Sequence, residues 1–257
     1  NVHFPSSMED FQNVRYRLAF EELLMLQLGL MSIKNTVQEL HTGIAFGSCP
    51  EINTFVEKLP FQLTEAQKRV FEEISKDMES NKAMNRLVQG DVGSGKTIVA
   101  VLALFKAVKN GYQGALMVPT EILAEQHYAS VRPLVENFGI KVSLLTGSTP
   151  KKQKNELLEK IKNGEVDIVI GTHTLIQDSV TFKKLGLVIT DEQHRFGVRQ
   201  RSTLLQKGIK QDNVSLIPDM LVMTATPIPR TLALILYGDL DISIIDQLPP
   251  GRKPVKT

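Results

Sequence analysis

The sequence predicts an α/β protein whose mostly parallel sheet is covered by helices on both faces. From about Pro60 onwards, short β-branched segments alternate with helical patterns, and this alternation is typical of a buried parallel sheet. In addition, a glycine-rich octapeptide, Gly90–Thr97, separates an apolar strand pattern from an apolar helix pattern. Strand, loop and helix occur in the order that a phosphate-binding loop requires.

The individual elements follow from the hydrophobic periodicity. Seven segments are expected to form strands: Arg86–Gln89, Ala115–Val118, Val142–Thr146, Asp167–Gly171, Leu187–Thr190, Leu221–Thr224 and Ile242–Ile245. Helical patterns alternate with them, notably Thr64–Glu79, Thr97–Lys109, Ile122–Phe138 and Lys151–Lys162. Pro133 should kink or end the third of these helices. Near the start of the chain, one long helix is expected to run to about Ile33, followed by a linker at Thr42–Pro50.

The composition allows a large core and sets few limits on partners. The chain has 257 residues, of which 42% are hydrophobic, and a formal net charge of +2. Such a small charge neither requires nor excludes a nucleic-acid partner, so any basic surface must be local. The single cysteine, Cys49, excludes an intrachain disulfide and fits a reducing compartment. No apolar run is long enough to suggest a membrane span.

The octapeptide Gly90–Thr97 satisfies the P-loop pattern G-x-x-x-x-G-K-[ST] completely. Its backbone N–H groups and the following helix N-terminus are suited to phosphate oxygens. The loop residues expected to cradle the nucleotide are Gly90, Gly93, Ser94 and Gly95. Lys96 should reach the β- and γ-phosphates, and the Thr97 hydroxyl should hold Mg²⁺. We therefore expect this chain to bind a nucleoside triphosphate.

An acidic pair follows the predicted strand Leu187–Thr190. In P-loop enzymes a carboxylate at such a strand end holds Mg²⁺ directly or through water, which is the role expected of Asp191. The adjacent Glu192 could orient and deprotonate the attacking water. The pair therefore extends the expected function from binding a nucleoside triphosphate to hydrolysing it.

A family resemblance becomes visible at this point. The tetrad Asp191–His194 resembles the DExH-type motif II of superfamily 2 helicases, and Arg195–Arg201 resembles its continuation in the RecG family of bacterial branched-DNA helicases. Met223–Thr231 contains a triplet similar to motif III, formed by Thr224, Ala225 and Thr226. The resemblance covers essentially the whole chain. It implies a RecA-like motor domain that uses ATP and Mg²⁺.

The resemblance also implies roles for residues around the nucleotide. Phe61–Gln67 is similar to the adenine-reading Q motif, in which Gln67 would hydrogen-bond the adenine edge and Phe61 would pack against the ring. His194 would couple the phosphate state to the triplet Thr224–Thr226. The alternative for His194 is a hydrogen-bonded core histidine.

Three predicted strand ends are similar to DNA-binding motifs of the family. Their residues are Pro119, Thr120 and Glu121, then Thr146 and Gly147, then Gly171, Thr172 and His173. In the family these loops hold the sugar–phosphate backbone, a task suited to N–H groups, threonine hydroxyls and helix N-termini. A nearby arginine cluster could contact either DNA phosphates or carboxylates of another domain, and both roles stay open for Arg195, Arg199 and Arg201.

The resemblance divides the chain into three parts. Residues 1–50 would form a helix and linker leading from an absent, DNA-reading wedge domain. Residues 51–247 would form the first motor domain, and residues 248–257 a proline-rich hinge to an absent second lobe. The chain begins with Asn1 rather than Met, which fits a piece of a longer protein. In this superfamily the second lobe supplies arginine fingers, so we expect the isolated chain to bind ATP weakly and hydrolyse it poorly.

In the complete protein, the resemblance implies ATP-driven translocation on branched DNA, such as replication forks and Holliday junctions, in recombination and repair. The expected protein is monomeric, bacterial, cytoplasmic and nucleoid-associated, without a membrane partner. Two alternatives stay open: a double-strand DNA translocase of the transcription-repair coupling type, and a module that binds nucleotide without turnover. A GTPase-like switch is disfavoured because Asn81–Met84 does not complete the guanine signature Asn-Lys-x-Asp.

Overall fold

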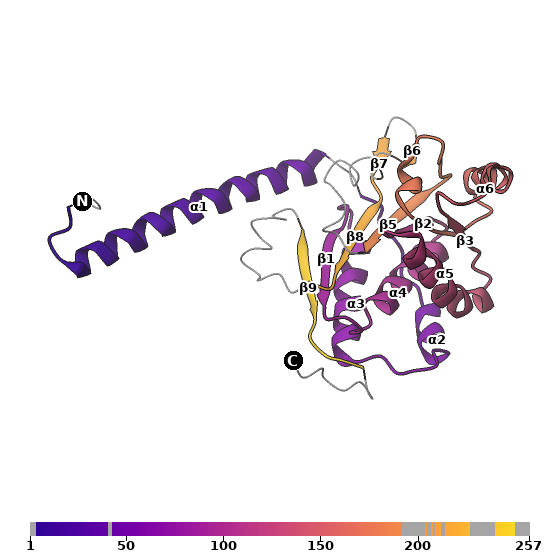
Figure 1. Ribbon diagram of the computed structural model, residues 1–257, viewed down its shortest axis with the longest axis horizontal. Coiled ribbons are helices and arrows are strands. Elements are labelled where there is room, and N and C mark those ends of the chain that lie inside the picture. The colour runs from indigo at the N-terminus through magenta and orange to yellow at the C-terminus, as the bar shows by residue number, and fades with distance from the viewer. Residues whose placement is uncertain are drawn as a thin grey trace. The chain divides into compact units, whose positions relative to one another are not determined.

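The structure is a computed structural model (Figure 1), and it describes residues 4–40, 43–191, 204, 207, 209–211, 214–226 and 240–249. The chain divides into two compact units. One comprises Asn1–Leu40 and Ile228–Leu240, and the other comprises His41–Pro227 and Asp241–Thr257.

The first unit contains the long helix α1 (Met8–Leu40). Its first turn is capped by Ser7, whose Oγ accepts a hydrogen bond from the Asp10 backbone N–H at 3.1 Å. The helix continues beyond the predicted end near Ile33 as far as Leu40. Within the part of the chain that the structure describes, no helix combines the length and apolar character needed to cross a membrane.

The second unit is built on a seven-stranded sheet with the strand order β3-β4-β2-β5-β8-β1-β9, and every neighbouring pair in it is parallel. The strands are β1 (Asn85–Gly90), β2 (Gln113–Met117), β3 (Val142–Leu145), β4 (Ile168–Gly171), β5 (Leu185–Asp191), β8 (Asp219–Thr224) and β9 (Asp241–Ile245). All seven were predicted, and their ends agree to within two residues. A short antiparallel pair, β6 (Ile209–Gln211) and β7 (Val214–Leu216), was not predicted.

Helices flank this sheet, as the sequence predicts. They are α2 (Glu51–Glu57), α3 (Glu65–Met78), α4 (Lys96–Lys109), α5 (Glu121–Val135) and α6 (Lys151–Asn163), with 3₁₀ turns η1 (Glu136–Phe138) and η2 (His173–Ile176). Helix α5 runs through Pro133 and ends two residues later at Val135, where the 3₁₀ turn η1 follows, so the helix ends close to the proline as expected. Helix α2 was not predicted.

Both faces of the sheet are buried. On β5, Leu187 and Ile189 face one side and pack in the core with residues of α3 and α4, while Val188 faces the other side and is also fully buried. Helix α4 is buried continuously from Ile98 to Ala107, which is expected of a helix that is apolar on all sides. The hydrophobic strand patterns in the sequence therefore correspond to a sheet that is covered on both faces.

The segment predicted as a linker is part of the second unit. The Gly43 N–H donates to the Asn81 carbonyl at 3.1 Å, and the Phe46 N–H donates to the Met78 carbonyl at 2.8 Å. The side chains of Ile44 and Phe46 are buried in the core. These apolar groups are covered by the sheet unit, and the second compact unit includes this segment.

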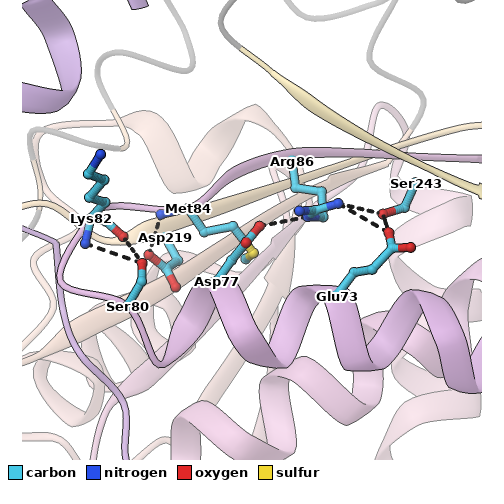
Figure 2. A network of polar contacts seen from close by, with 8 residues as sticks. All are labelled: Glu73, Asp77, Ser80, Lys82, Met84, Arg86, Asp219 and Ser243. Atoms are coloured by element: carbon cyan, nitrogen blue, oxygen red, sulfur yellow. Dashed lines mark hydrogen bonds and ion pairs between the residues drawn. The ribbon is translucent and has the colours of Figure 1, made fainter. Parts of the chain in front are cut away.

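A polar network ties β1 to its neighbours (Figure 2). The Arg86 guanidinium donates through Nε to Asp77 at 2.7 Å, and through Nη1 to Glu73 at 3.2 Å and to Ser243 at 2.7 Å. Its side chain is only 11% exposed. Since both carboxylates belong to α3 and Ser243 belongs to β9, this one cation joins the helix to the edge strand.

Asp219 is a buried acid at the start of β8. Its Oδ1 accepts a hydrogen bond from the Met84 N–H at 2.8 Å (Figure 2). Its Oδ2 is buried without a hydrogen-bond partner among the described residues. Burial raises the pKa of this carboxyl well above its ordinary value.

Candidate nucleotide and DNA site

The predicted site residues converge because the carboxyl ends of the parallel strands share one edge of the sheet. The P-loop follows β1, Asp191 ends β5 and Thr224 ends β8, and these three strands are neighbours. A cavity of about 460 Å³ lies between them, and its lining includes Lys96, Thr97 and Asp191. The candidate phosphate site is therefore assembled from strands that are far apart in the sequence.

The P-loop has the backbone geometry that its glycines permit. Gly93 and Gly95 have φ angles of 80° and 84°, in the left-handed region that favours glycine. Gly95 is the N-cap of α4, so the helix N-terminus opens towards the cavity. The Lys96 ammonium donates to the carbonyls of Gly90 at 2.7 Å and Asp91 at 3.0 Å. These hydrogen bonds to the loop backbone hold the lysine at the wall of the cavity.

Ser94 occupies a different position from its neighbours in the loop. Its side chain is 1% exposed, and its Oγ has no hydrogen-bond partner among the described residues. It lines a separate cavity of about 310 Å³ beside β9 rather than the cavity that contains Lys96. The side chain of Ser94 therefore faces away from the candidate phosphate site.

Gln67 connects helix α3 to the P-loop. Its Oε1 accepts from the Thr64 N–H at 2.9 Å, and its Nε2 donates to the Ser94 carbonyl at 2.8 Å. Thr64 completes a capping box by accepting from the Gln67 N–H at 3.2 Å. Both polar atoms of the amide are thus hydrogen-bonded to backbone in a side chain that is 2% exposed. A direct contact of Gln67 with adenine stays a prediction.

An apolar cavity of about 800 Å³ adjoins the phosphate site. Phe61, which is 47% exposed, lines it together with Ile98 and Leu134. Gly95 and Thr97 line both this cavity and the one that contains Lys96. The two cavities therefore offer a polar compartment and an apolar compartment side by side, which suits a ligand with charged phosphates and a flat base.

His127 on α5 is a member of the site that the sequence did not single out. Its Nε2 lies 3.1 Å from Asp191 Oδ2, and the side chains are 10% and 16% exposed. The helix buries Ala124, His127, Val131 and Val135. This spacing is typical of a core-facing stripe, so the sequence offers no signal that separates His127 from an ordinary core histidine.

The loops predicted to contact DNA also lie together, because β3, β4 and β2 are adjacent. Glu121 Oε1 accepts from the Ser148 N–H at 3.0 Å, which ties the loop after β2 to the loop after β3. Hydrogen bonding by Ser148 lowers the pKa of Glu121, with a smaller contribution from His173 after β4. The loop after β2 therefore contacts the loop after β3, and the loop after β4 follows the strand that lies between theirs in the sheet.

The threonine side chains of these loops make hydrogen bonds within the protein. The Thr146 hydroxyl lies 2.9 Å from Ser148 Oγ, and the Thr172 hydroxyl lies 3.3 Å from Thr174 Oγ1. Thr120 caps α5 by accepting from the Leu123 N–H at 3.3 Å. Thr146 and Thr172 are buried, Pro119 and Thr120 are half-buried, Gly171 is buried, and Gly147 and His173 are exposed. The outer surface is thus formed by backbone and by the exposed residues.

The triplet Thr224–Thr226 begins at the last residue of β8, beside the phosphate site. The Thr224 and Thr226 hydroxyls are 2.7 Å apart, and Ala225 lines the cavity with Lys96. Several predicted residues lie outside the described part of the chain: Glu192, His194, Arg195, Arg199 and Arg201.

The residues present fit a metal that arrives with a nucleotide. Among the described residues, no group of three or more His, Cys, Asp or Glu side chains could hold a metal ion. Thr97 and Asp191 nevertheless line one cavity with Lys96. Mg²⁺ in nucleotide sites takes one or two protein ligands and completes its shell with phosphates and water. A hydroxyl and a carboxylate beside a P-loop match that pattern.

Comparisons with known proteins identify the family of this chain. The DEAD/DEAH box helicase family model matches residues 64–235. The chain is 53% identical over its full length to the ATP-dependent DNA helicase RecG of Bacillus subtilis, of which it covers 37%. It is 51% identical to RecG of Thermotoga maritima over 100% of this chain and 32% of the relative. The chain thus spans about a third of the length of these relatives.

Solved structures show the same similarity. A structure of RecG bound to a three-way DNA junction matches 98% of this chain and 33% of that chain, with a TM-score of 0.81 and 48% identity. An ATP-dependent RNA helicase from Sulfolobus tokodaii, described as hypothetical, matches 77% of this chain and 57% of that chain at 19% identity, with a TM-score of 0.53, and shares the fold. Because the family model matches well over half of the sequence, this chain belongs to the DEAD/DEAH box helicase family.

Proposed function

We propose that this chain is the first motor domain of an ATP-dependent DNA helicase of the RecG type. The observation that carries the proposal is the single cavity that brings Lys96 and Thr97 of the P-loop together with Asp191 of β5. Similarity to RecG helicases over nearly the whole length of this chain supports branched DNA as the substrate, since one of these relatives is bound to a three-way DNA junction. The complete protein would act on replication forks and Holliday junctions in recombination and repair, as a monomer in the bacterial cytoplasm and nucleoid.

ATP would lie across the two adjoining cavities. The P-loop backbone and the Lys96 ammonium would hold the β- and γ-phosphates, and the apolar compartment beside Phe61 would hold the base. Thr97 and Asp191 would hold Mg²⁺, which neutralises charge on the phosphate oxygens when bound. Glu192, the next residue in the chain, would accept a proton from the attacking water. His194 would couple the phosphate state of the nucleotide to the triplet Thr224–Thr226.

DNA would bind along the surface formed by the loops after β2, β3 and β4. Gly147 and His173 are exposed there, and backbone N–H groups suit contacts to phosphates that carry no sequence information. The ATP cavity lies at the same edge of the sheet. Hydrolysis could therefore be coupled to movement along DNA, with a second lobe joined through residues 248–257.

A pair of variants in the complete protein tests the proposed roles. Lys96→Ala should lose nucleotide binding, because a phosphate contact is removed. Glu192→Gln should keep binding and lose turnover, because only water activation is removed. Binding of a fluorescent ATP analogue and ATP hydrolysis with junction DNA would be measured for both. Similar binding by the two variants would contradict the division of roles.

ATP hydrolysis by the isolated chain distinguishes this proposal from the alternative that this one domain is a complete enzyme. We expect the 257-residue chain to bind nucleotide weakly and to hydrolyse it slowly, with little stimulation by DNA, because a second lobe supplies arginine fingers in this superfamily. Hydrolysis by the chain would be compared with and without junction DNA. Strong DNA-dependent turnover would show that the chain is catalytically complete.

A further inference from the structure

We propose that His127 is a positioning residue that orients the Asp191 carboxylate for the metal ion of bound nucleotide and connects this carboxylate to the DNA-facing end of α5. The inference rests on the proposed function, because it assumes that Asp191 is a ligand of Mg²⁺. It adds to that function a residue that neither motif II nor the P-loop contains.

The contact between the two residues lies at the wall of the nucleotide cavity. His127 Nε2 is 3.1 Å from Asp191 Oδ2. A carboxylate oxygen accepts hydrogen bonds, so Nε2 is the nitrogen that donates. Both side chains are largely buried, and both line the cavity that contains Thr97. The imidazole therefore restricts how the carboxylate can rotate at the place where a metal would be bound.

Such a contact has a known physical effect on metal sites. A hydrogen-bond partner behind a ligating carboxylate fixes its orientation, and loss of such a partner typically lowers metal affinity by about 10–100-fold. Here the partner comes from α5, a different element from the strand that carries Asp191. The orientation of the carboxylate therefore depends on the position of α5 against β5.

Helix α5 joins this contact to the candidate DNA surface. The helix begins at Glu121, whose carboxylate holds the loop at Ser148. His127 follows six residues later, which is a rise of about 9 Å along a helix. A stiff segment of less than two turns thus separates the DNA-facing loops from the contact with Asp191. Movement of these loops on DNA would move His127 relative to Asp191.

The Mg²⁺ dependence of nucleotide binding tests the proposal. The dissociation constant of a fluorescent ATP analogue would be measured for the 257-residue chain in Mg²⁺ and in EDTA, and the ratio of the two constants compared. His127→Ala should reduce the tightening by Mg²⁺ about tenfold and leave the affinity in EDTA unchanged. An unchanged ratio, or an equal loss of affinity in both conditions, overturns the proposal.

Two replacements of His127 test whether the position of the N–H donor matters. Glutamine can place an N–H near the position of Nε2, whereas the shorter asparagine reaches only the position of Nδ1. His127→Gln should therefore recover most of the Mg²⁺ effect and His127→Asn should not. Equal behaviour of these two variants contradicts a role for the Nε2 hydrogen bond, and their comparison holds even if His127→Ala does not fold.

Two controls separate this inference from the function on which it rests. Tyr128→Phe changes the neighbouring, half-buried residue on α5, which bonds to Arg132, and should leave the ratio as in the wild type. A changed ratio in Tyr128→Phe would attribute the effect to α5 in general and overturn the assignment to His127. Asp191→Asn should abolish the Mg²⁺ effect. If Asp191→Asn kept it, the proposed metal site itself would fail, independently of His127.

Discussion

The Gln67 side-chain amide donates a hydrogen bond to the Ser94 carbonyl at 2.8 Å, and thereby joins the first turn of α3 to the P-loop. The same amide closes the capping box of α3 by accepting from the Thr64 N–H. One buried side chain thus stabilises the helix start and the phosphate-binding loop together. Its replacement should affect both, and the two effects can be separated.

Gln67→Glu should weaken nucleotide binding. The carboxylate can still accept from the Thr64 N–H, but its second oxygen would face the Ser94 carbonyl, and two acceptors repel each other. We expect a loss of about 1–3 kcal/mol in the free energy of unfolding, measured by urea denaturation, and weaker binding of a fluorescent ATP analogue. Thr64→Ala, which removes only the cap, should cost about 1 kcal/mol and preserve binding. Equal loss of binding in both variants would contradict this separation.

Gly95→Ala should abolish nucleotide binding. Gly95 has a φ of +84°, and an added Cβ would lie 2.2 Å from Gln67 Nε2, so the loop or the glutamine must move. Gly111→Ala is the matched control, because Gly111 has a φ of +81° with nothing within 4 Å of the added atom. The control should lose about 1 kcal/mol of stability and bind nucleotide normally in the same titration. Normal binding by Gly95→Ala would show that the loop tolerates the displacement.

Arg86→Met should destabilise the sheet unit by about 3 kcal/mol, since it leaves Glu73 and Asp77 without their buried cation. The two carboxylates are partly exposed, which places the expected loss near the lower end for a broken buried pair. Arg69→Met is the control, because Arg69 pairs with Asp246 at the surface with side chains 51% and 59% exposed. It should cost less than about 1 kcal/mol. Comparable losses in urea denaturation would argue against a special role for Arg86.

Asp219→Asn should remove a pH dependence of stability. The unfolded carboxyl ionises near pH 4 (about 3.9), whereas burial raises the pKa of the folded one. Between the two values the folded chain holds a proton that the unfolded chain has released, so stability falls as pH rises, by at most about 1.4 kcal/mol per pH unit. In urea denaturation above about pH 4, the wild type should lose stability relative to the variant as the pH rises. Parallel curves would contradict the assignment.

Local patterns were sufficient for most of the second unit. Each predicted strand carries its apolar residues in one short run, so its identity does not depend on its neighbours. Helix α2 was missed because its seven residues are too few for a clear period. The stretch Thr42–Pro50 suggested a linker because of its Gly and Pro, but Ile44 and Phe46 insert into the core. Burial of that kind depends on a surface that the segment itself does not contain.

The residues of the candidate site also fall into two groups, those that local patterns predict and those whose role depends on distant partners. Lys96, Thr97 and Asp191 were predictable because their chemistry requires those residue types next to a strand end. The role of Gln67 at the P-loop and that of His127 at Asp191 were not predictable. Each depends on a partner distant in sequence, 27 residues away for Ser94 and 64 for Asp191. Hydrogen bonds of this range leave no periodic trace in the sequence.

The sequence by itself determined that this chain is an α/β protein with a P-loop, an acidic strand end and a set of loops at strand ends, because these features are local. Only the tertiary structure decided which strand ends are neighbours. The order β3-β4-β2-β5-β8-β1-β9 groups the candidate DNA loops on one half of the sheet edge and the nucleotide site on the other. The strands β2 and β5 meet between the halves, and there α5 brings His127 to Asp191. Strand order arises from how helices and strands pack over both faces of the sheet, which no single segment encodes.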